Sequence, residues 1–600
     1  MAKDKLLSQF YIKISGNNAS EELMFDIDEV VVDTSVHLPN MFTIRLNDSG
    51  LQWMDSKTFD LGKEVVISAK AIEASQTEKL MEGEVTTIEP EFVQDMGATL
   101  VISGYDKSHR LHRGKKTRVF VQMSDSAIVQ KIASECKLTN DIDRTSPNHE
   151  HVFQDYQTDM EFIQDRARRN GYFAYVDADG KLIFKKQPRT RGKVALEWSK
   201  NLIDLQIRKS TAEQVGEVNV HGWDPKTKKE ILGKAKSPEG TPVVGGRSQD
   251  GGKAAKSAHR VQSVEHVNNL PVQDVKEANA IAQSTLNEKG NAFLQAEGTC
   301  LGDPEVQAGA NVEIKGVGKN FSGTYLVTRA IHRYGRDGYT TRFEISGYRA
   351  NTLGELLTSN NGSGGYGVVV AKVTNTKDPE NLARVKVQYP TISDQLESNW
   401  ASLVNPMAGP GRGFQFIPEV NDQVLVAFEY NDFNKPYILG ALWNGTDKPP
   451  VPSQDAVNDD GVNKRVIKTR YGHTITLDDT KEAEQISIAS KSGHTITLDD
   501  KKGEEKISVI DKTKKNSIFI DSKANTLTIK ADGNINIETP KDVMIKGNNI
   551  NLEANANAKV KANSNLDLEA TSKATVKGNA GIDVQAGGPA NIKGATVNLN

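Results

Sequence analysis

The feature that most constrains this chain is a short repeat near its C-terminal end. Pairs of apolar residues separated by one position recur about every eight residues, from Ile518 and Ile520 to Val597 and Leu599. This alternation has the period of two that a β-strand needs when one of its faces is buried. Gly, Asn, Asp, Lys and Ala fill the intervals between the pairs, and several of these residues favour turns. The repeat therefore predicts a ladder of short strands joined by sharp corners.

A second repeat precedes this octad pattern. The octapeptide Gly472–Asp479, with the sequence GHTITLDD, recurs without change at Gly493–Asp500. It indicates a duplicated hairpin-like unit. No aromatic residue follows Phe519, so the octad region cannot build an ordinary aromatic-rich core.

The octad repeat cannot be stable as a single row of strands. Fixing the backbone of eight residues costs roughly 8–16 kcal/mol in entropy, whereas burying two aliphatic side chains returns about 3–6 kcal/mol. Each short strand also has two open edges. Either the chain coils on itself as a solenoid, or several copies intertwine in one shared prism. Eight residues are few for a full single-chain turn and suit one side of a triangular cross-section, which favours three chains.

Composition excludes several classes of function. The 600 residues include 75 basic and 78 acidic side chains, so the basic surplus that phosphate binding requires is absent. Cys136 and Cys300 are the only cysteines, too few for a disulfide framework or a thiolate metal site. No apolar run has the length of a signal peptide or a membrane span, so we expect a chain that is made and folded in the cytoplasm.

Two linkers divide the chain. Residues 360–365 are rich in Gly and Ser, and residues 446–463 contain a proline-rich connector. The interval between the linkers has six short strand signals and no helix signal, which predicts a small closed barrel. The expected strands are Gly367–Val373, Ala383–Tyr389, Trp400–Val404, Gly413–Ile417, Gln423–Tyr430 and Tyr437–Trp443.

The first 355 residues combine strand and helix signals. A capping-box pattern over Thr158–Glu161 predicts a helix that ends at Gly171. Two further helices are expected over 126–137 and 274–289, with Gly290 stopping the second. Residues 224–260 are rich in Lys, Gly and Ser, and we expect them to form a mobile loop or an insertion.

Four groups of residues are weak candidates for chemistry. The basic run from Arg110 to Arg118 fits a solvated or interface-lining face better than an anion site. His149 and His151 could bind a metal, but no third ligand is near in sequence, so a strand or loop is favoured. Gly316–Lys319 lacks the spacing of a phosphate loop and predicts a turn. His473 and His494 are repeat copies and are expected to be structural. The sequence thus predicts no catalytic residue, no metal site and no cofactor.

Several motifs together resemble the VgrG family. Gly104–Leu111, followed by basic residues through Arg118, is similar to the hub signature of that family. His151–Gln154, Thr158–Ile163 and Arg166–Tyr172 resemble its next blocks. The segments that resemble its baseplate OB-fold are Trp400-Ala401, Met407–Gly409, Arg412-Gly413, Pro418–Val420, Asp422–Val426 and Pro436–Gly440.

The resemblance implies a mainly β fold in four parts. Residues 1–358 would form a hub of two tube-like β-barrels with small α/β elements, and residues 359–447 an OB-fold barrel. Residues 448–516 would hold a linker and the duplicated hairpin units. Residues 517–600 would form an intertwined trimeric β-helix needle. Three chains with two barrels each would make a pseudo-sixfold ring that can seat on a hexameric tube.

The function that the resemblance implies is mechanical. The chain would be the non-enzymatic central spike of a contractile injection machine, joining the hexameric inner tube and baseplate proteins to the tip and piercing a target membrane when the sheath contracts. After cytoplasmic assembly it would be part of an injected or extracellular phage-tail-like particle. Type VI secretion, an extracellular particle and a phage tail all use such a part. No nucleic-acid partner is expected.

The last rung is the expected partner site. Three copies of Thr596, Val597, Asn598, Leu599 and Asn600 would present a blunt apolar end, onto which the resemblance places a PAAR-type tip protein. Two alternatives stay open. One is an enzyme: either a single-chain solenoid polysaccharide lyase, or a trimeric β-helix enzyme or effector-bearing spike with hydrolase activity. The other is a surface adhesin with a trimeric stalk.

Overall fold

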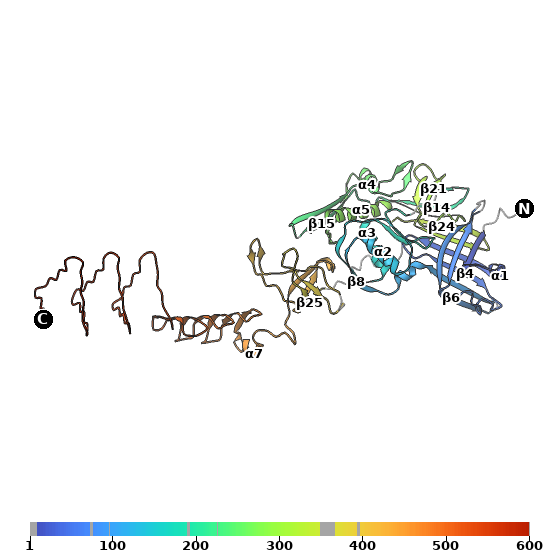
Figure 1. Ribbon diagram of the computed structural model, residues 1–600. Helices are drawn as coiled ribbons and strands as arrows, with labels where there is room; N and C mark the ends of the chain where they lie inside the picture. Colours follow the sequence, from blue (N-terminus) through green and yellow to red (C-terminus); the bar gives the residue numbers. More distant parts are fainter. Residues whose placement is uncertain are drawn as a thin grey trace. The chain divides into compact units, whose positions relative to one another are not determined.

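The computed structural model describes residues 9–71, 76–94, 97–188, 193–224, 226–347, 367–392 and 396–598. The chain divides into two compact units, Met1–Lys448 and Pro449–Asn600 (Figure 1). Most regular structure is β, which confirms the predicted class. The linker expected at 360–365 lies outside the described residues.

An eleven-stranded sheet organises the first unit. Its strand order is β14-β20-β24-β23-β3-β4-β7-β6-β5-β1-β2, and every neighbouring pair is antiparallel. The strands are β1 (Gln9–Ile14), β2 (Asn17–Asn18), β3 (Ile27–Ser35), β4 (Met41–Asn47), β5 (Glu64–Lys70), β6 (Glu78–Val93), β7 (Gly97–Asp106), β14 (Leu202–Lys209), β20 (Leu294–Leu301), β23 (Arg329–Gly335) and β24 (Gly338–Ile345).

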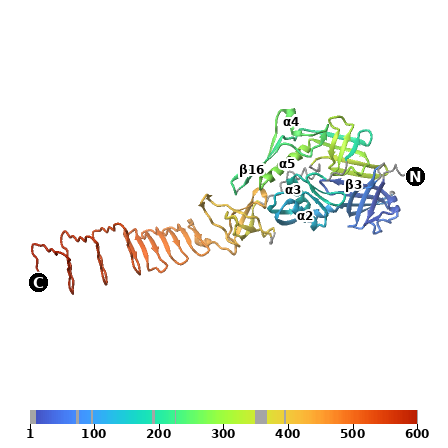
Figure 2. The same cartoon turned by 45° about the horizontal axis from the view of Figure 1, so that its top comes forward.

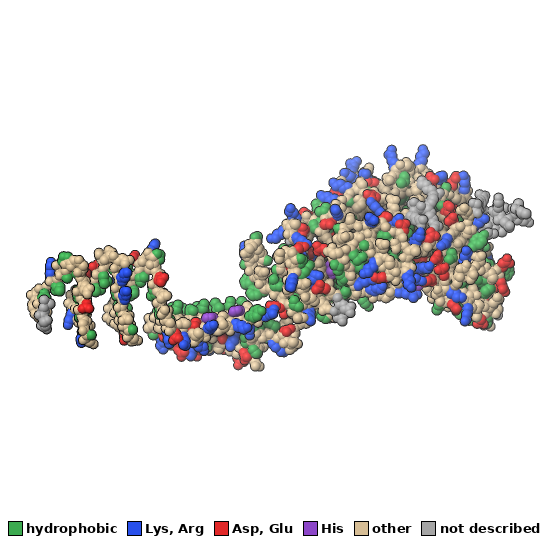
Figure 3. All heavy atoms as spheres, in the orientation of Figure 1, with side chains coloured by type: hydrophobic (Ala, Val, Ile, Leu, Met, Phe, Trp, Pro, Cys, Tyr) green, Lys and Arg blue, Asp and Glu red, His purple; other side chains and the backbone are tan. Residues whose placement is uncertain are grey.

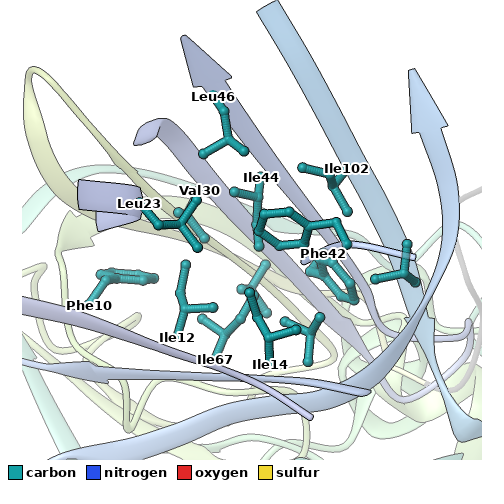
Figure 4. Close-up of a cluster of buried hydrophobic side chains, with 14 of the residues drawn as sticks. Phe10, Ile12, Ile14, Leu23, Val30, Phe42, Ile44, Leu46, Ile67 and Ile102 are labelled. Carbon is teal, nitrogen blue, oxygen red and sulfur yellow. The ribbon is translucent and has the colours of Figure 1, made fainter. Parts of the chain in front are cut away.

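Two apolar cores lie against this sheet. The first is built by alternate residues of β1, β3, β4, β5 and β7 together with Leu23 of α1 (Glu21–Asp26) (Figure 4). The second joins β14, β20, β23 and β24 to a five-stranded sheet. That sheet contains β13 (Lys193–Glu197), β17 (Val243–Val244), β18 (Arg247–Ser248), β21 (Asn311–Lys315) and β22 (Gly323–Leu326). Two cores on one continuous sheet fit the expected pair of barrel-like halves.

A small α/β element has its own core. It contains η1 (Lys107–His112), β8 (Lys116–Met123), α2 (Asp125–Glu135), β9 (Asn140–Ile142), β10 (His149–Gln157), α3 (Asp159–Asn170), β11 (Phe173–Val176) and β12 (Leu182–Lys185). The capping box is confirmed, since Thr158 and Glu161 exchange side-chain-to-backbone hydrogen bonds. Gly171 ends α3 with a φ of 68°, a conformation that glycine adopts without strain.

The prediction of a mobile loop over 224–260 is wrong. These residues contain β16 (Lys229–Ala235), the short strands β17 and β18, and α4 (Gly251–His259). β16 pairs with β15 (Glu217–Asp224), which also pairs with β19 (Val264–Val267). Lys, Gly and Ser indicated a loop, but Gly233 allows close packing: a Cβ there would lie 2.2 Å from the carbonyl carbon of Ala278.

Ala278 belongs to α5 (Val275–Asn291), which covers this small sheet. The expected stop at Gly290 is wrong, because α5 continues to Asn291. Gly290 instead permits contact with a neighbouring loop, since a Cβ there would lie 2.5 Å from Cβ of Pro238.

Residues 369–441 form the predicted small barrel. Its sheet has the order β26-β25-β30-β31-β27, with β25 (Val369–Asn375), β26 (Lys386–Gln388), β27 (Ser402–Leu403), β30 (Gln423–Phe428) and β31 (Pro436–Ala441). The expected strand Gly413–Ile417 is wrong. A two-residue turn joins β28 (Ala408–Gly409) and β29 (Arg412–Gly413). Beyond β29, Phe414 and Phe416 belong to no strand and are 51% and 63% exposed.

The second unit begins with α7 (Ser453–Ala456) and the pair β32 (Val457–Asn458) and β33 (Gly461–Val462). A seven-stranded antiparallel meander follows, in strict chain order (Figure 2). Its strands are β34 (Lys464–Lys468), β35 (Thr474–Asp478), β36 (Gln485–Ala489), β37 (Thr495–Asp499), β38 (Lys506–Ile510), β39 (Ser517–Asp521) and β40 (Thr526–Lys530). The meander thus includes the first two apolar pairs of the octad series, and residues 531–598 form no regular strand.

Candidate assembly surfaces

One face of the β34–β40 sheet is apolar and uncovered within the chain. Cross-strand pairing aligns its side chains in two ladders, and each residue is 38–64% exposed. The first ladder is Ile467, Ile475, Ile488, Ile496, Val509, Ile518 and Ile529; the second is Leu477, Ile486, Leu498, Ile507, Ile520 and Leu527. Figure 3 shows the apolar side chains as a green row along this sheet. We call this surface the apolar face.

The apolar face arises because apolar and polar residues alternate along each strand. In β35, Ile475 and Leu477 point to one side, while Thr474 and Thr476 point to the other. The same Thr-x-Thr pattern recurs in β37. A continuous aliphatic surface that stays exposed is typical of an interaction site, which makes the apolar face a candidate assembly surface. The open sheet also differs from the closed coil that a single-chain solenoid would form.

The octad region has the predicted corners. Its backbone bends at 532–533, 540–541, 548, 555–556, 563–564, 571–572, 579–580, 587–588 and 595, close to every eighth residue. Between the bends the chain is extended and, within the described residues, its rungs form no strand pairs with each other. Figure 1 shows this segment winding as an open coil. Every residue from 532 to 598 is exposed, so the octads have no core within one chain.

The expected tip residues lie at the end of this coil. Thr596, Val597 and Asn598 are exposed, with Val597 at 47%. Leu599 and Asn600 lie outside the described residues. Docking of a tip protein here stays a prediction.

Part of the basic run of the hub is paired with carboxylates of the same chain. Lys116 and Arg118 each lie 2.6 Å from a carboxylate oxygen of the buried Asp159. Arg110 pairs with Glu84. His112, Arg113 and Lys115 of the same run are exposed, so the expected solvated face holds for them, whereas carboxylates of the hub neutralise Arg110, Lys116 and Arg118.

His149 and His151 lie on β10, as the strand alternative predicted, and they have different partners. Nε2 of His149 is 3.3 Å from Oδ1 of the buried Asp125. Burial raises the pKa of Asp125, but the hydrogen bond from His149 and the charge of Arg166 outweigh it and bring this pKa down to about 2. Burial lowers the pKa of His149, yet Asp125 outweighs that effect and the pKa is raised. The two groups form a buried ion pair when the imidazole of His149 is protonated.

His151 belongs to a junction that the sequence did not reveal. Its Nδ1 donates to Oδ1 of Asn434 in the OB-fold at 2.9 Å. Next to it, Phe153 stacks on Phe433 and joins the core of the OB-fold barrel. Val152 points to the opposite side, into the α/β core. The paired strands β8 and β10 thus contribute side chains to two cores, one on each face. The one hint in the sequence was the adjacent apolar pair Val152 and Phe153, because neighbouring residues of a strand point to opposite faces.

The remaining candidates are structural. The Lys491 main-chain N–H donates to Nδ1 of His473 at 3.4 Å, and that of Lys512 donates to Nδ1 of His494 at 3.2 Å. This equivalence confirms the structural role expected for both copies. Gly316–Lys319 forms the predicted turn between β21 and β22.

The described residues contain no cluster of three or more His, Cys, Asp or Glu side chains arranged to hold a metal ion. Among the helices in those ranges, none has both the length and the apolar character needed to cross a bilayer.

Comparisons with known proteins agree with this architecture. Residues 4–335 match the family model described as the Alg8 N-terminal domain, and residues 369–443 match the type VI secretion system/phage-baseplate injector OB domain. The type VI secretion system spike protein VgrG2a of Pseudomonas aeruginosa is 28% identical over 114 residues, and VgrG3 of Vibrio cholerae is 26% identical over 128. These matches cover 18% and 20% of this chain and 13% of each relative.

Solved structures of similar proteins cover more of the chain. A Francisella PdpA–VgrG complex, in its lidded form, is 9% identical, covers 88% of this chain and 81% of the other, and gives a TM-score of 0.49. An Escherichia coli component of the type VI secretion system is 15% identical and covers 72% of this chain and 99% of its own, with a TM-score of 0.45.

The OB-domain match and the two sequence relatives confirm the resemblance to VgrG-type spike proteins drawn from the motifs. The chain belongs to the Alg8 N-terminal domain family, because the model of that family matches residues 4–335, more than half of its length.

Proposed function

We propose that the chain is the non-enzymatic central spike of a contractile injection machine and that it works as a homotrimer. One observation carries the proposal: the second unit has an uncovered apolar face and a regularly bent coil, and neither has a core within one chain. Both must be completed by other polypeptide. Further copies of the same chain supply the same repeat in the same register.

Three copies match the repeat best. The octad forms one straight side between two bends, and three such sides close a triangle. The open coil leaves each rung without strand partners, and intertwined copies would fill these positions and satisfy the backbone groups. Covering the apolar face would contribute roughly 1.5–3 kcal/mol for each fully buried aliphatic side chain, summed over thirteen ladder positions in each copy.

The mechanical role follows from this assembly. Three hubs with two barrel-like halves each would offer six similar units to a hexameric inner tube. The OB-folds would face baseplate proteins, and the needle would lead through the target membrane when the sheath contracts. The curated relatives are named type VI secretion system spike proteins, which supports the role. The rung Thr596–Asn600 would seat a PAAR-type tip protein.

The test uses a strain in which this gene is deleted and all other genes of the contractile machine are intact. We expect the full chain to restore contracted and extended particles in electron micrographs, together with killing of target cells. A chain that ends before Pro449 should fail to restore either. Hydrolysis of peptidoglycan by the purified chain, abolished by one point substitution, would favour the effector-bearing alternative and contradict the proposal.

A further inference from the structure

The apolar face is bordered by two rows of turns with opposite charge. Turns 469–473, 490–494 and 511–516 lie on one side and contain five Lys or Arg and one Asp; we call them the basic row. Turns 479–484, 500–505 and 522–525 lie on the other side, and we call them the acidic row. The first two of these turns contain six Asp or Glu and three Lys, whereas the third contains Lys523 and no acidic residue. The Asp of the basic row, Asp511, accepts hydrogen bonds from Thr513 and Asn516 of its own turn.

The duplicated octapeptide places one member of each row on the same strand. His473 precedes β35 and Asp479 follows it, while His494 precedes β37 and Asp500 follows it. The main-chain bonds of the ladder continue past the strand ends: Thr469 N–H donates to the carbonyl of His473, and Asp500 N–H donates to the carbonyl of Glu484. Alternation therefore carries all four side chains to the apolar face.

His494 shows this placement directly, because it lines one groove together with Ile496 and Ile518 of the apolar ladders. Its Nδ1 accepts the Lys512 main-chain N–H. The ring proton of the neutral imidazole is then on Nε2, which is left to donate elsewhere. Asp500 lies at the other end of the same strand, β37, and therefore at the opposite border of the apolar face.

These two groups cannot meet within one chain. Six residues of extended backbone separate His494 from Asp500, which is roughly 20 Å. They can meet between copies. In a closed ring with rotational symmetry, each strand stays at its own level along the axis, and the end of a strand in one copy approaches the start of the same strand in the next.

We propose that the basic row of each copy pairs with the acidic row of the next copy around the needle. This inference rests on the proposed three-chain assembly. His494 of one copy donates from Nε2 to the carboxylate of Asp500 of its neighbour. At the level of β35, His473 approaches Asp479 of the neighbour, a carboxylate that also accepts from Arg465 of its own chain. The pairs close the three corners of the prism at the levels of β35 and β37, and the apolar ladders fill its interior.

Paired cysteines test this contact. In the matched variant, His494→Cys with Asp500→Cys, each chain can form one disulfide with each neighbour but none with itself. We expect mild oxidation to produce a covalent trimer on non-reducing SDS gels, reversed by dithiothreitol. The mismatched control, His473→Cys with Asp500→Cys, places the thiols two strand levels apart, about 9–10 Å. This exceeds the roughly 7 Å limit of Cα separation for a disulfide, so little covalent trimer should form.

The outcomes separate the two proposals. A chain that sediments as a trimer but gives no more covalent trimer in the matched than in the mismatched variant overturns the row pairing and leaves the trimer intact. A wild-type chain that sediments as a folded monomer overturns the proposed function itself. Wild-type protein under the same oxidant gives the background from Cys136 and Cys300.

A charge exchange tests the same contact without new cysteines. Asp500→Lys places a lysine opposite His494 of the neighbour and should lower the temperature at which the trimer dissociates. Adding His494→Glu restores opposite charges and should recover most of that loss. Equal dissociation temperatures for the single and the double variant would contradict the pairing.

Discussion

Phe153 of the hub stacks on Phe433 of the OB-fold, with ring centroids 4.8 Å apart and ring planes 16° apart. Phe428 and Tyr389 pack around Phe433 and extend the aromatic cluster into the barrel core. Lys435, two residues on, donates from Nζ to the carbonyl of Val272 at 3.1 Å. The hub and the OB-fold therefore share one core at this junction, which would suit the proposed mechanical role.

Removing this ring should uncouple the two domains. Phe433→Ala deletes the centre of the aromatic cluster, and a buried Phe→Ala change costs about 3–5 kcal/mol. We expect calorimetry to show the OB-fold melting before the hub, and limited proteolysis to cut between them. Phe416→Ala is the control, because Phe416 is 63% exposed. An unchanged single transition in Phe433→Ala would contradict the shared core.

The buried pair of Asp125 and His149 should make hub stability depend on pH. The lowered pKa of Asp125 means that its contribution is present above about pH 4 and is lost as the pH falls toward 2. The raised pKa of His149 means that its contribution is present below about pH 6.5 and is lost as the pH rises through the folded value. The pair is therefore strongest between about pH 4 and 6.5.

His149→Gln tests this window by removing the charge of the imidazolium. We expect the hub to melt earlier than wild type, with a loss of about 1–3 kcal/mol near pH 5.5 and a smaller loss near pH 9. The exposed surface change Lys253→Gln should show no such trend. A loss that grows from pH 5.5 to pH 9 would mean that His149 stabilises the hub as a neutral ring.

One substitution on the apolar face should disrupt assembly. Ile496→Asp would place three carboxylates against one another inside the proposed prism, at a cost of at least several kcal/mol per trimer. Thr497→Asp, one position along β37, points to the opposite face and should be nearly silent. Heat resistance of the oligomer on SDS gels compares the two. Equal resistance would show that the assigned interior face is wrong.

Gly233→Ala should destabilise the hub although it adds one methyl group. The new Cβ would lie 2.2 Å from the carbonyl carbon of Ala278, which is backbone and cannot move aside without shifting α5. We expect a loss of roughly 1–3 kcal/mol in chemical denaturation. Gly246→Ala is an instructive comparison, because nothing lies within 4 Å of its Cβ and its cost comes only from a φ of 75°. A larger loss at Gly246 would contradict the close packing of β16 on α5.

Local patterns were sufficient for much of this fold. The capping box before α3 and the bends of the octad region depend on residues near one another in sequence, and both were predicted. The strands of the OB-fold were predicted wherever alternation coincided with a pairing partner. Gly413–Ile417 alternates equally well, but no strand of the described residues pairs with it beyond Gly413, and alternation alone does not provide a partner.

The errors have a common physical cause. Gly233 and Gly290 indicated a loop and a helix end, whereas each is a glycine that allows two distant segments to approach closely. Arg118 and Asp159 are far apart in sequence, so the ion pair that neutralises Arg118 could not be predicted from the sequence. The junction at Phe153 depends in the same way on Phe433, which lies in another domain.

The mass of the purified full-length chain in solution tests the central claim most directly. Sedimentation velocity at micromolar concentration, with circular dichroism to show that the protein is folded, distinguishes the possibilities. We predict one species at three times the chain mass of 65.7 kDa, which persists on dilution because the octads have no core in a single chain. A folded, soluble species of 65.7 kDa with its apolar face uncovered would contradict the account.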